Sequence, residues 1–464
     1  MWGVYVSVVT KAGLSVTSMF RLLSNMMVTY ACLARVVLAA ETPSFSGAEG
    51  FGAVATGGRG GDVYYVTSLD NDGVGSLRDA IRQGDRTVLF KTSGTINLES
   101  KLDIKAANIT IAGQTAPGAG ICLRGKELNI SGENIVVRFL RVRPGDERGE
   151  EHDAVTVWGA NRVVIDHCSL SWSTDSLNDV VRDSSHVTVQ WCILAEPLNE
   201  SVHRKGAHGY GTGWGSGPKG GNSFHHNLLA HCNSRSPRLG SEQDALVDVR
   251  NNVIYNMGNG WAYGGEHARA NVVANYYKPG PNTVRPHELF RISSPDTRMY
   301  LHDNVISGQL QVTQDNASGL VGDDGIDLAA ALVAEPFDVP HVGVDSAENA
   351  YELVLTFAGA TLPRRDPVDT RVLSEVRGGT GRIISSPREV GGWPALQSKE
   401  PPQDSDGDGM PDSWERSHDL DPQNAADGAA YTNEGYTNLE HYLNGLAART
   451  IPLAVKHNPP PPQN

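Results

Sequence analysis

Cysteines and basic residues are both scarce in this chain of 464 residues. Lys and Arg number 39 against 53 Asp and Glu, a formal net charge of -14. This excludes a general nucleic-acid binder that neutralises phosphates, and an acidic ligand would need a special device to bind. With 5 Cys and no CxxC pair, neither a disulfide scaffold nor a zinc finger fits. Four Cys lie beyond residue 40 and allow either one disulfide or buried thiols: Cys122, Cys168, Cys192 and Cys232.

Long apolar runs are also missing, even at the amino terminus. Arg21 and Arg35 leave no uninterrupted apolar stretch of about 18 residues, so a membrane-spanning helix is not expected. Residues 1–40 contain no Asp or Glu and end in Val37-Leu38-Ala39-Ala40, a small-residue processing site. We therefore predict a secretory signal over 1–40 and a secreted protein, extracellular or periplasmic.

A short strand-like pattern repeats through the middle of the chain. Its fourth position is occupied by Cys168, Cys192, Asn227, Asn252, Asn275 and Asn304, at spacings of 24, 35, 25, 23 and 29 residues. Parallel coils of a β-solenoid stack about 4.8 Å apart, so Asn side chains at one position can bond their copies above and below. The spacing predicts an all-β fold, a single-stranded parallel β-helix, over residues 41–390. A general crossover preference makes it right-handed.

The strand-like pattern of the sequence ends after about residue 340. Residues 346–359 and 369–376 read as helices, and 391–403 as a Pro- and Gly-punctuated linker. Residues 404–446 form a separate acidic unit, and 447–464, with four consecutive Pro, a disordered tail.

Acidic and basic residues recur on one side of the predicted solenoid. Counting from the repeat position places Asp153, Asp175 and Asp179 on adjacent coils, with Arg235 two coils further on. Each residue alone could be a solvated turn residue. Three neighbouring carboxylates would repel one another unless a cation lay between them, and an all-oxygen cluster suits Ca²⁺.

Several motifs resemble the pectate lyases of the first polysaccharide lyase family. They are Gly57-Gly58-Arg59-Gly60-Gly61, Gly73 to Ile81, Val164-Ile165-Asp166-His167-Cys168-Ser169-Leu170, His225-His226-Asn227 and Asn233-Ser234-Arg235-Ser236-Pro237-Arg238. The resemblance implies a right-handed parallel β-helix that cleaves pectate by Ca²⁺-dependent β-elimination to 4,5-unsaturated products. It assigns calcium to Asp153, Asp175 and Asp179, with Glu151 at a further acidic position, and the Brønsted base to Arg235. Asp175 stands where many members carry Glu. The second arginine, Arg238, follows Arg235 by three residues instead of five.

The basic neighbours of Arg235 lead to two further expectations. Lys205 and Arg238 are candidate clamps for substrate carboxylates, and a cationic surrounding would favour neutral Arg235 and an alkaline optimum. The Gly-rich segment 205–215 contains His208 and could either stack on sugar rings or fill space between coils.

Two other functions remain open from the residues alone. A polygalacturonase-type hydrolase could use Asp175 and Asp179 as its carboxylate pair without metal, but this leaves Arg235 unexplained. A non-catalytic polysaccharide-binding protein could use the same groove.

The acidic carboxyl-terminal segment contains a calcium-loop pattern. Asp404, Asp406, Asp408, Asp412 and Glu415 match positions 1, 3, 5, 9 and 12 of an EF-hand loop. The segment also resembles type-3 thrombospondin or dockerin-like repeats, which implies a Ca²⁺ unit that could dock to a partner or act only structurally. We expect a monomer with neither nucleic-acid nor membrane partners.

Overall fold

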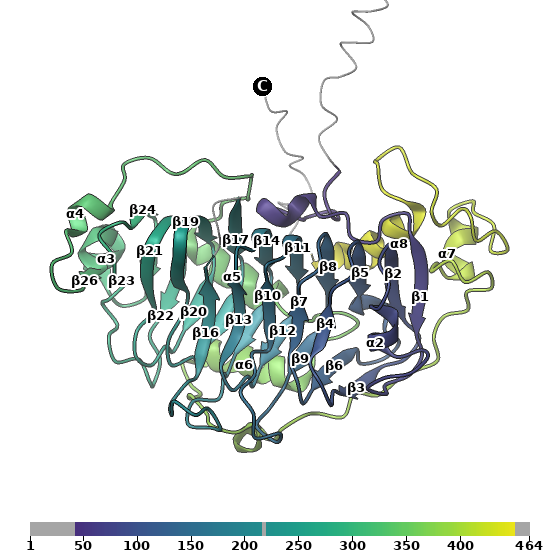
Figure 1. The fold of residues 1–464 in the computed structure, drawn as a ribbon, viewed down its shortest axis with the longest axis horizontal. Coiled ribbons are helices and arrows are strands. Elements are labelled where there is room, and N and C mark those ends of the chain that lie inside the picture. Colours follow the sequence, from purple (N-terminus) through teal and green to yellow (C-terminus); the bar gives the residue numbers. More distant parts are fainter. Residues whose placement is uncertain (1–41, 216–219, 451–464) are drawn as a thin grey trace, which may run out of the picture. The chain divides into compact units, whose positions relative to one another are not determined.

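Three stacks of short parallel strands form the body of the molecule in the computed structural model, which describes residues 42–215 and 220–450 (Figure 1). We call the stack that carries the site the cleft stack. Its strands are β4 (Leu102–Ile104), β7 (Leu128–Ile130), β10 (Val155–Trp158), β13 (Ser176–Val181), β16 (Tyr210–Trp214), β19 (Arg238–Arg250), β21 (Ala262–Val273), β23 (Phe290–Ile292) and β26 (Leu320–Gly322).

Each coil continues from the cleft stack into a second and a third stack. The second stack shares the long strands β19 and β21 and adds β1 (Asp62–Val66), β2 (Arg86–Phe90), β5 (Ile109–Ala112), β8 (Ile135–Arg138), β11 (Asn161–Asp166), β14 (Ser185–Gln190), β17 (Gly221–His225) and β24 (Arg298–His302). The third stack contains β3 (Gly94–Asn97), β6 (Ile121–Arg124), β9 (Arg141–Arg143), β12 (Ser169–Ser171), β15 (Ile193–Ala195), β18 (Leu228–Ala230), β20 (Val253–Tyr255), β22 (Tyr276–Lys278) and β25 (Val305–Ile306). The predicted parallel β-helix is confirmed.

The predicted asparagine ladder runs between the second and third stacks. Asn227, Asn252, Asn275 and Asn304 each donate from Nδ2 to Oδ1 of the next asparagine, at 2.9–3.1 Å. The last acceptor is Asn316, which the repeat pattern missed because a short helix precedes it. Cys192 continues the column, since its backbone N–H donates to Asn227 Oδ1 at 2.8 Å. The four donor asparagines are fully buried and Asn316 is nearly so, so each amide satisfies groups that water cannot reach.

Breaking this ladder should destabilise the fold. In Asn252→Ala, the carbonyl of Phe224 and both the backbone and side-chain donors of Asn227 lose partners inside the core. We expect the free energy of unfolding to fall by about 3 kcal/mol or more, since each buried unsatisfied group costs about 1–3 kcal/mol. Urea unfolding measures this, with the exposed Asn424→Ala as the control expected to change stability by less than about 0.5 kcal/mol. A loss equal to that of the control would contradict the role of the ladder.

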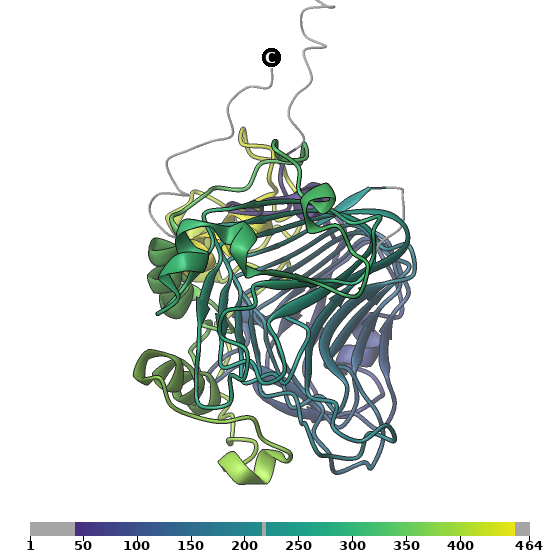
Figure 2. The same cartoon turned by 90° about the vertical axis from the view of Figure 1, so that its left-hand side faces the viewer.

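Helices close the two ends of the solenoid and cover the third stack (Figures 1 and 2). Within the described residues they are α2 (Leu77–Ala80), α3 (Leu310–Gln314), α4 (Leu328–Ala331), α5 (Ala347–Phe357), α6 (Pro367–Gly378), α7 (Asp412–Ser417) and α8 (Asn438–Ala447), with 3-10 turns η1 (Phe51–Val54), η2 (Gly113–Thr115), η3 (Asn316–Gly319), η4 (Pro387–Val390) and η5 (Ala448–Thr450). Helices α5 and α6 match the two predicted helices. Their apolar faces pack on β15, β18 and β20 through one buried cluster that includes Val354, Val372 and Val376.

The four cysteines beyond the predicted signal are buried free thiols, which settles the alternative left open by the sequence. Cys168 and Cys192 lie at the ladder position and face each other, the backbone N–H of Cys168 contacting Cys192 Sγ at 3.4 Å. They act as small apolar residues of the core.

The carboxyl-terminal segment differs from the expectation of a separate unit. Leu439 and Leu443 of α8, with Met410, pack on Leu89 and Ala112 of the first coils, and one compact unit includes both parts. The predicted linker 391–403 is also attached, since Ser398 forms an antiparallel bridge with Gly118. The carboxyl-terminal segment packs on the solenoid because the apolar face of α8 must be covered, and the outer face of the second stack covers it.

The predicted tail begins later than residue 447. Helix α8 ends at Ala447 and η5 follows over Ala448–Thr450, where the Thr450 carbonyl accepts a hydrogen bond from His167 Nε2 at 3.3 Å. The predicted signal and the remainder of the tail lie outside the described residues. Among the described residues, no helix is both long and apolar enough to cross a membrane.

Candidate active site

The loops that lead from the third stack back to the cleft stack carry most of the predicted site residues, and Asp179 and Arg238 lie on the strands that follow them. Residues 144–154 lead into β10, 172–175 into β13, 196–209 into β16 and 231–237 into β19. Strand register then aligns Thr156, Asp179, Gly213 and Arg238 on successive coils. Residues far apart in sequence thus meet along one flank of the solenoid, as the counting from the repeat position predicts.

Two of the predicted calcium ligands, Asp153 and Asp179, lie close enough to repel each other. Asp153 accepts hydrogen bonds from Thr156 Oγ1 at 2.7 Å and from the Ser176 backbone at 3.0 Å. Burial, followed by the charges of Asp179 and Asp175, raises the pKa of Asp153 well above its ordinary value. Burial also raises the pKa of Asp179 to about 6, against the lowering effect of Arg235. Carboxylates in this state gain from a nearby cation.

Gly213 of the Gly-rich segment packs directly against the Asp179 carboxylate. Its backbone N–H donates to Asp179 Oδ1 at 2.9 Å, and a Cβ at residue 213 would lie 2.7 Å from that same oxygen. Residues 210–214 form strand β16 instead of a loop, and Trp214 is buried in the core. Side chains of a strand alternate between its two faces, and that of Trp214 points into the core. Trp214 therefore cannot stack on sugar rings.

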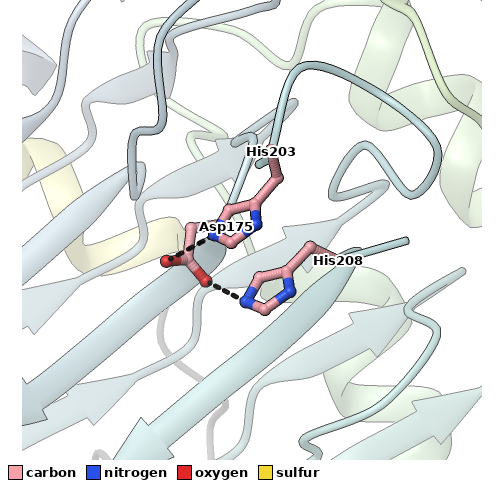
Figure 3. A group of neighbouring side chains, drawn as sticks. All are labelled: Asp175, His203 and His208. Carbon is pink, nitrogen blue, oxygen red and sulfur yellow. Dashed lines mark ion pairs between the residues drawn. The ribbon is translucent and has the colours of Figure 1, made fainter. Parts of the chain in front are cut away.

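Asp175, the third predicted calcium ligand, faces two histidines (Figure 3). His208 Nε2 lies 3.1 Å from Asp175 Oδ1, and His203 Nε2 lies 3.6 Å from Asp175 Oδ2. Glu151 also lies near this group, with Oε2 at 3.8 Å from His203 Nε2, and it accepts the Arg204 backbone N–H at 2.9 Å. His208, a predicted substrate ligand, is buried and directed at this carboxylate. Burial lowers the pKa of His208 to about 4, so its ring is neutral near pH 7.

Arg235 lies in the same group, held from three directions. Its Nη1 donates to Ser176 Oγ at 3.2 Å and lies 3.9 Å from Asp179 Oδ2, and its guanidinium carbon lies 4.1 Å from the centre of the Tyr210 ring. Its φ of 64° is left-handed, and the Thr212 N–H donates to its carbonyl at 2.6 Å.

The expected cationic surrounding of Arg235 is not observed. Although burial disfavours the charged guanidinium, Asp179 and Tyr263 outweigh it and raise the pKa of Arg235 above its usual value. Arg238 instead forms an ion pair with Glu266 at 3.1 Å, and Lys205 is exposed in the turn before His208. Glu266 lies on the following coil, a pairing that no local pattern around Arg238 shows.

Tyr210 is a positioning residue that the sequence did not single out by role. Its ring contacts both the Arg235 guanidinium and the His208 ring, whose centre lies at 3.9 Å with the two planes tilted by 51°. Tyr210→Leu removes the aromatic face, worth about 0.5–2 kcal/mol, and should lower kcat about tenfold with little change in KM. Tyr210→Phe keeps the face and should retain kcat. Steady-state kinetics on polygalacturonate, the substrate that the sequence resemblance implies, separates the two, and equal losses in both variants would contradict a role for the ring.

The predicted carboxyl-terminal ligands come together with one exception. Asp404, Asp406 and Asp408 form one cluster of carboxylates, and Asp408 with Glu415 and Asp427 forms an adjoining one. Several of their oxygens are buried without hydrogen-bond partners, including both of Glu415. Asp412 does not join: its carboxylate accepts the Ser405 N–H and Oγ–H at 2.8 and 2.9 Å. Asp427, twelve residues beyond the loop pattern, takes part where Asp412 was expected.

The carboxylates, the half-buried Arg235 and the parallel β-helix are together the features expected of a polysaccharide lyase of this fold class. The chain is 34% identical over 419 residues to a probable pectate lyase C of Aspergillus terreus, across 87% of this chain and 94% of that protein. A probable pectate lyase C of Aspergillus fumigatus is 33% identical over 447 residues, across 93% of this chain and 99% of that protein. The chain therefore belongs to the pectate lyase family. No family model matches it.

Solved structures agree on the fold. The cedar pollen allergen jun a 1 superimposes with a TM-score of 0.51 at 19% identity, across 67% of this chain and 92% of that one. A pectate lyase bound to a hexasaccharide gives a TM-score of 0.50 at 16% identity, across 69% and 98%. Both support the parallel β-helix.

Proposed function

We propose that this chain is a secreted, calcium-dependent lyase that cleaves pectate by β-elimination. The observation that supports it best is the convergence of Asp153, Asp179 and Arg235 around Ser176. Ser176 donates its backbone N–H to Asp153 and accepts from Arg235 with its hydroxyl. Its relatives are named pectate lyases. Because both the protein and an acidic polymer are negatively charged, carboxylates that hold a divalent cation would allow the two to bind.

The cleft carboxylates fit Ca²⁺ by their chemistry. Oxygens of Asp153, Asp175 and Asp179, with Glu151 nearby, offer the hard donors that Ca²⁺ prefers. Asp175 Oδ1 is buried and accepts no hydrogen bond, and the pKa of Asp153 is raised by burial and by its acidic neighbours. When bound there, the ion would neutralise a uronate carboxylate and so acidify the proton on C5.

Arg235 would remove that proton. In its deprotonated guanidine form, Arg235 accepts the C5 proton on one nitrogen and becomes guanidinium, the C–H electron pair forms the C4–C5 double bond, and the C4–O4 bond breaks. The leaving oxygen takes a proton from water or from the guanidinium. Ser176 and Tyr210 hold the guanidinium in one orientation, which favours a single direction of attack. Lys205 and Arg238 are proposed to contact substrate carboxylates, Arg238 after leaving Glu266.

A direct assay tests this function. Incubation with polygalacturonate and Ca²⁺ should produce the ultraviolet absorbance of a conjugated unsaturated uronate. Reducing sugar without this absorbance would point to a hydrolase, and binding without turnover to a polysaccharide-binding protein.

We also propose that Asp404, Asp406, Asp408, Glu415 and Asp427 hold a second Ca²⁺ in an EF-hand-like unit. Buried carboxylate oxygens without donors support it, because such groups are costly unless a cation compensates them. Its contacts with the first coils favour a structural role over docking to a partner.

The proposed unit should make stability depend on pH and calcium. Burial and neighbouring acids raise the pKa of both Asp408 and Glu415 to about 7. The folded state therefore holds these protons more tightly than the unfolded state, and without Ca²⁺ stability falls as pH rises from about 4 to 7. Thermal unfolding in chelator at pH 5 and pH 8 should show the lower Tm at pH 8, with Ca²⁺ restoring it. In Asp408→Asn, the Tm should depend less on both pH and Ca²⁺. If the Tm of this variant responded as that of wild type does, the proposed calcium site would be contradicted.

A further inference from the structure

The histidine pair beside Asp175 is not explained by calcium chemistry. One ring nitrogen of His203, one ring nitrogen of His208 and an oxygen of Asp175 all lie within 4.8 Å of one another (Figure 3). Both histidines are buried, and Asp175 Oδ1 accepts no hydrogen bond although His208 Nε2 is 3.1 Å away. Ca²⁺ takes oxygen ligands, so two imidazole nitrogens are foreign to its site.

We propose that Asp175, His203 and His208 bind a divalent transition-metal ion of the zinc class. Imidazole nitrogen together with carboxylate oxygen is the donor set preferred by Zn²⁺, Co²⁺ and Ni²⁺. Glu151, whose Oε2 lies 3.8 Å from His203 Nε2, is placed to supply a fourth ligand.

The distances fit a tetrahedral site. Ligands about 2.0–2.1 Å from Zn²⁺ in a tetrahedron lie about 3.3 Å from one another. The contacts of Asp175 lie near this value, with Oδ1 3.1 Å from His208 Nε2 and Oδ2 3.6 Å from His203 Nε2. Because they use different oxygens, the carboxylate must turn slightly to present one oxygen to the shared ion.

Binding requires a small rearrangement of the rings. They are stacked in parallel, with centres 3.5 Å apart and planes 4° apart, so one ring must turn to direct its lone pair at a shared ion. Rotation about χ2 of histidine is soft, which keeps this cost low. His203 must also carry its proton on Nδ1, which now accepts the Lys205 N–H at 3.2 Å. Metal binding therefore shifts the exposed turn that carries Lys205.

One consequence rests on the proposed function, whereas the binding itself does not. Asp175 is shared between the histidine pair and the proposed calcium site. Zinc-class ions should therefore inhibit the lyase, and excess Ca²⁺ should relieve the inhibition.

Titration of the full chain with Co²⁺ tests the binding. An imidazole-containing tetrahedral site gives intense visible absorption, whereas six-coordinate sites made of oxygen, as in the carboxyl-terminal clusters, give only faint bands. We expect the intense bands at one equivalent, displaced by Zn²⁺. Calorimetric Zn²⁺ titration of His203→Ala and His208→Ala should show affinity lowered about 100-fold or more, since even an outer partner of a ligand is worth about 10- to 100-fold. The exposed His302→Ala is the matched control and should bind as wild type.

Faint bands alone in the wild type would overturn the proposal, whatever the variants do. So would undiminished Zn²⁺ affinity in folded His203→Ala and His208→Ala proteins. These readouts use no substrate, so they stand apart from the ultraviolet assay that tests the lyase.

Discussion

Arg235→Lys should lower kcat on polygalacturonate by about 1000-fold, within the range of about 10²–10⁴ expected for a general base. Lysine keeps the charge but loses the planar group that contacts Ser176 Oγ and the Tyr210 ring at once. The pKa of Arg235 is raised above its usual value, so wild-type activity should increase with pH up to the point of unfolding. Initial rates from product absorbance at saturating substrate and Ca²⁺ measure both effects.

Arg238→Lys is the matched control for this substitution. Arg238 lies three residues away and pairs with Glu266, so the change should alter mainly KM. If Arg235→Lys retained chelator-sensitive turnover close to that of wild type, Arg235 would lose its assignment as the base.

Chelation should lower turnover by about 100-fold or more. A Lewis acid at the uronate carboxylate is worth several kcal/mol, and each 1.4 kcal/mol or so corresponds to a factor of ten in rate. The rate should return when Ca²⁺ is added back. The measurement is the same absorbance assay before chelation, after it and after readdition.

Because the chain has two proposed calcium sites, the chelator alone cannot assign the effect. Asp408→Asn impairs the carboxyl-terminal site and leaves the cleft intact. This variant should lose the stabilisation by Ca²⁺ while its turnover still requires the ion. If turnover of Asp408→Asn no longer responded to Ca²⁺, the ion required for catalysis would be the one at the carboxyl-terminal site, contrary to the account.

Equivalent positions on successive coils made the fold predictable. In a solenoid, residues one coil apart touch, so the spacing of Asn227, Asn252, Asn275 and Asn304 carries three-dimensional information. The same counting placed Asp153, Asp179 and Arg235 on one flank.

Side-chain pairing within the site could not be read from those spacings. Glu266 neutralises Arg238 from the next coil, and Asp427 replaces Asp412 from beyond the calcium loop. Both depend on loop conformation, which the repeat does not specify. The raised pKa of Arg235 likewise depends on a neighbour that the spacings do not show, since the charged side chain beside its guanidinium is Asp179 and not Lys205 or Arg238.

The central claim is that the enzyme breaks the C4–O4 glycosidic bond of a uronate by elimination, which forms a C4–C5 double bond and adds no water. The most direct measurement is mass spectrometry of oligomers released from polygalacturonate in heavy-oxygen water. The account predicts unsaturated ends whose cleaved bonds carry no solvent oxygen. Saturated products with one solvent oxygen at each new reducing end would contradict it.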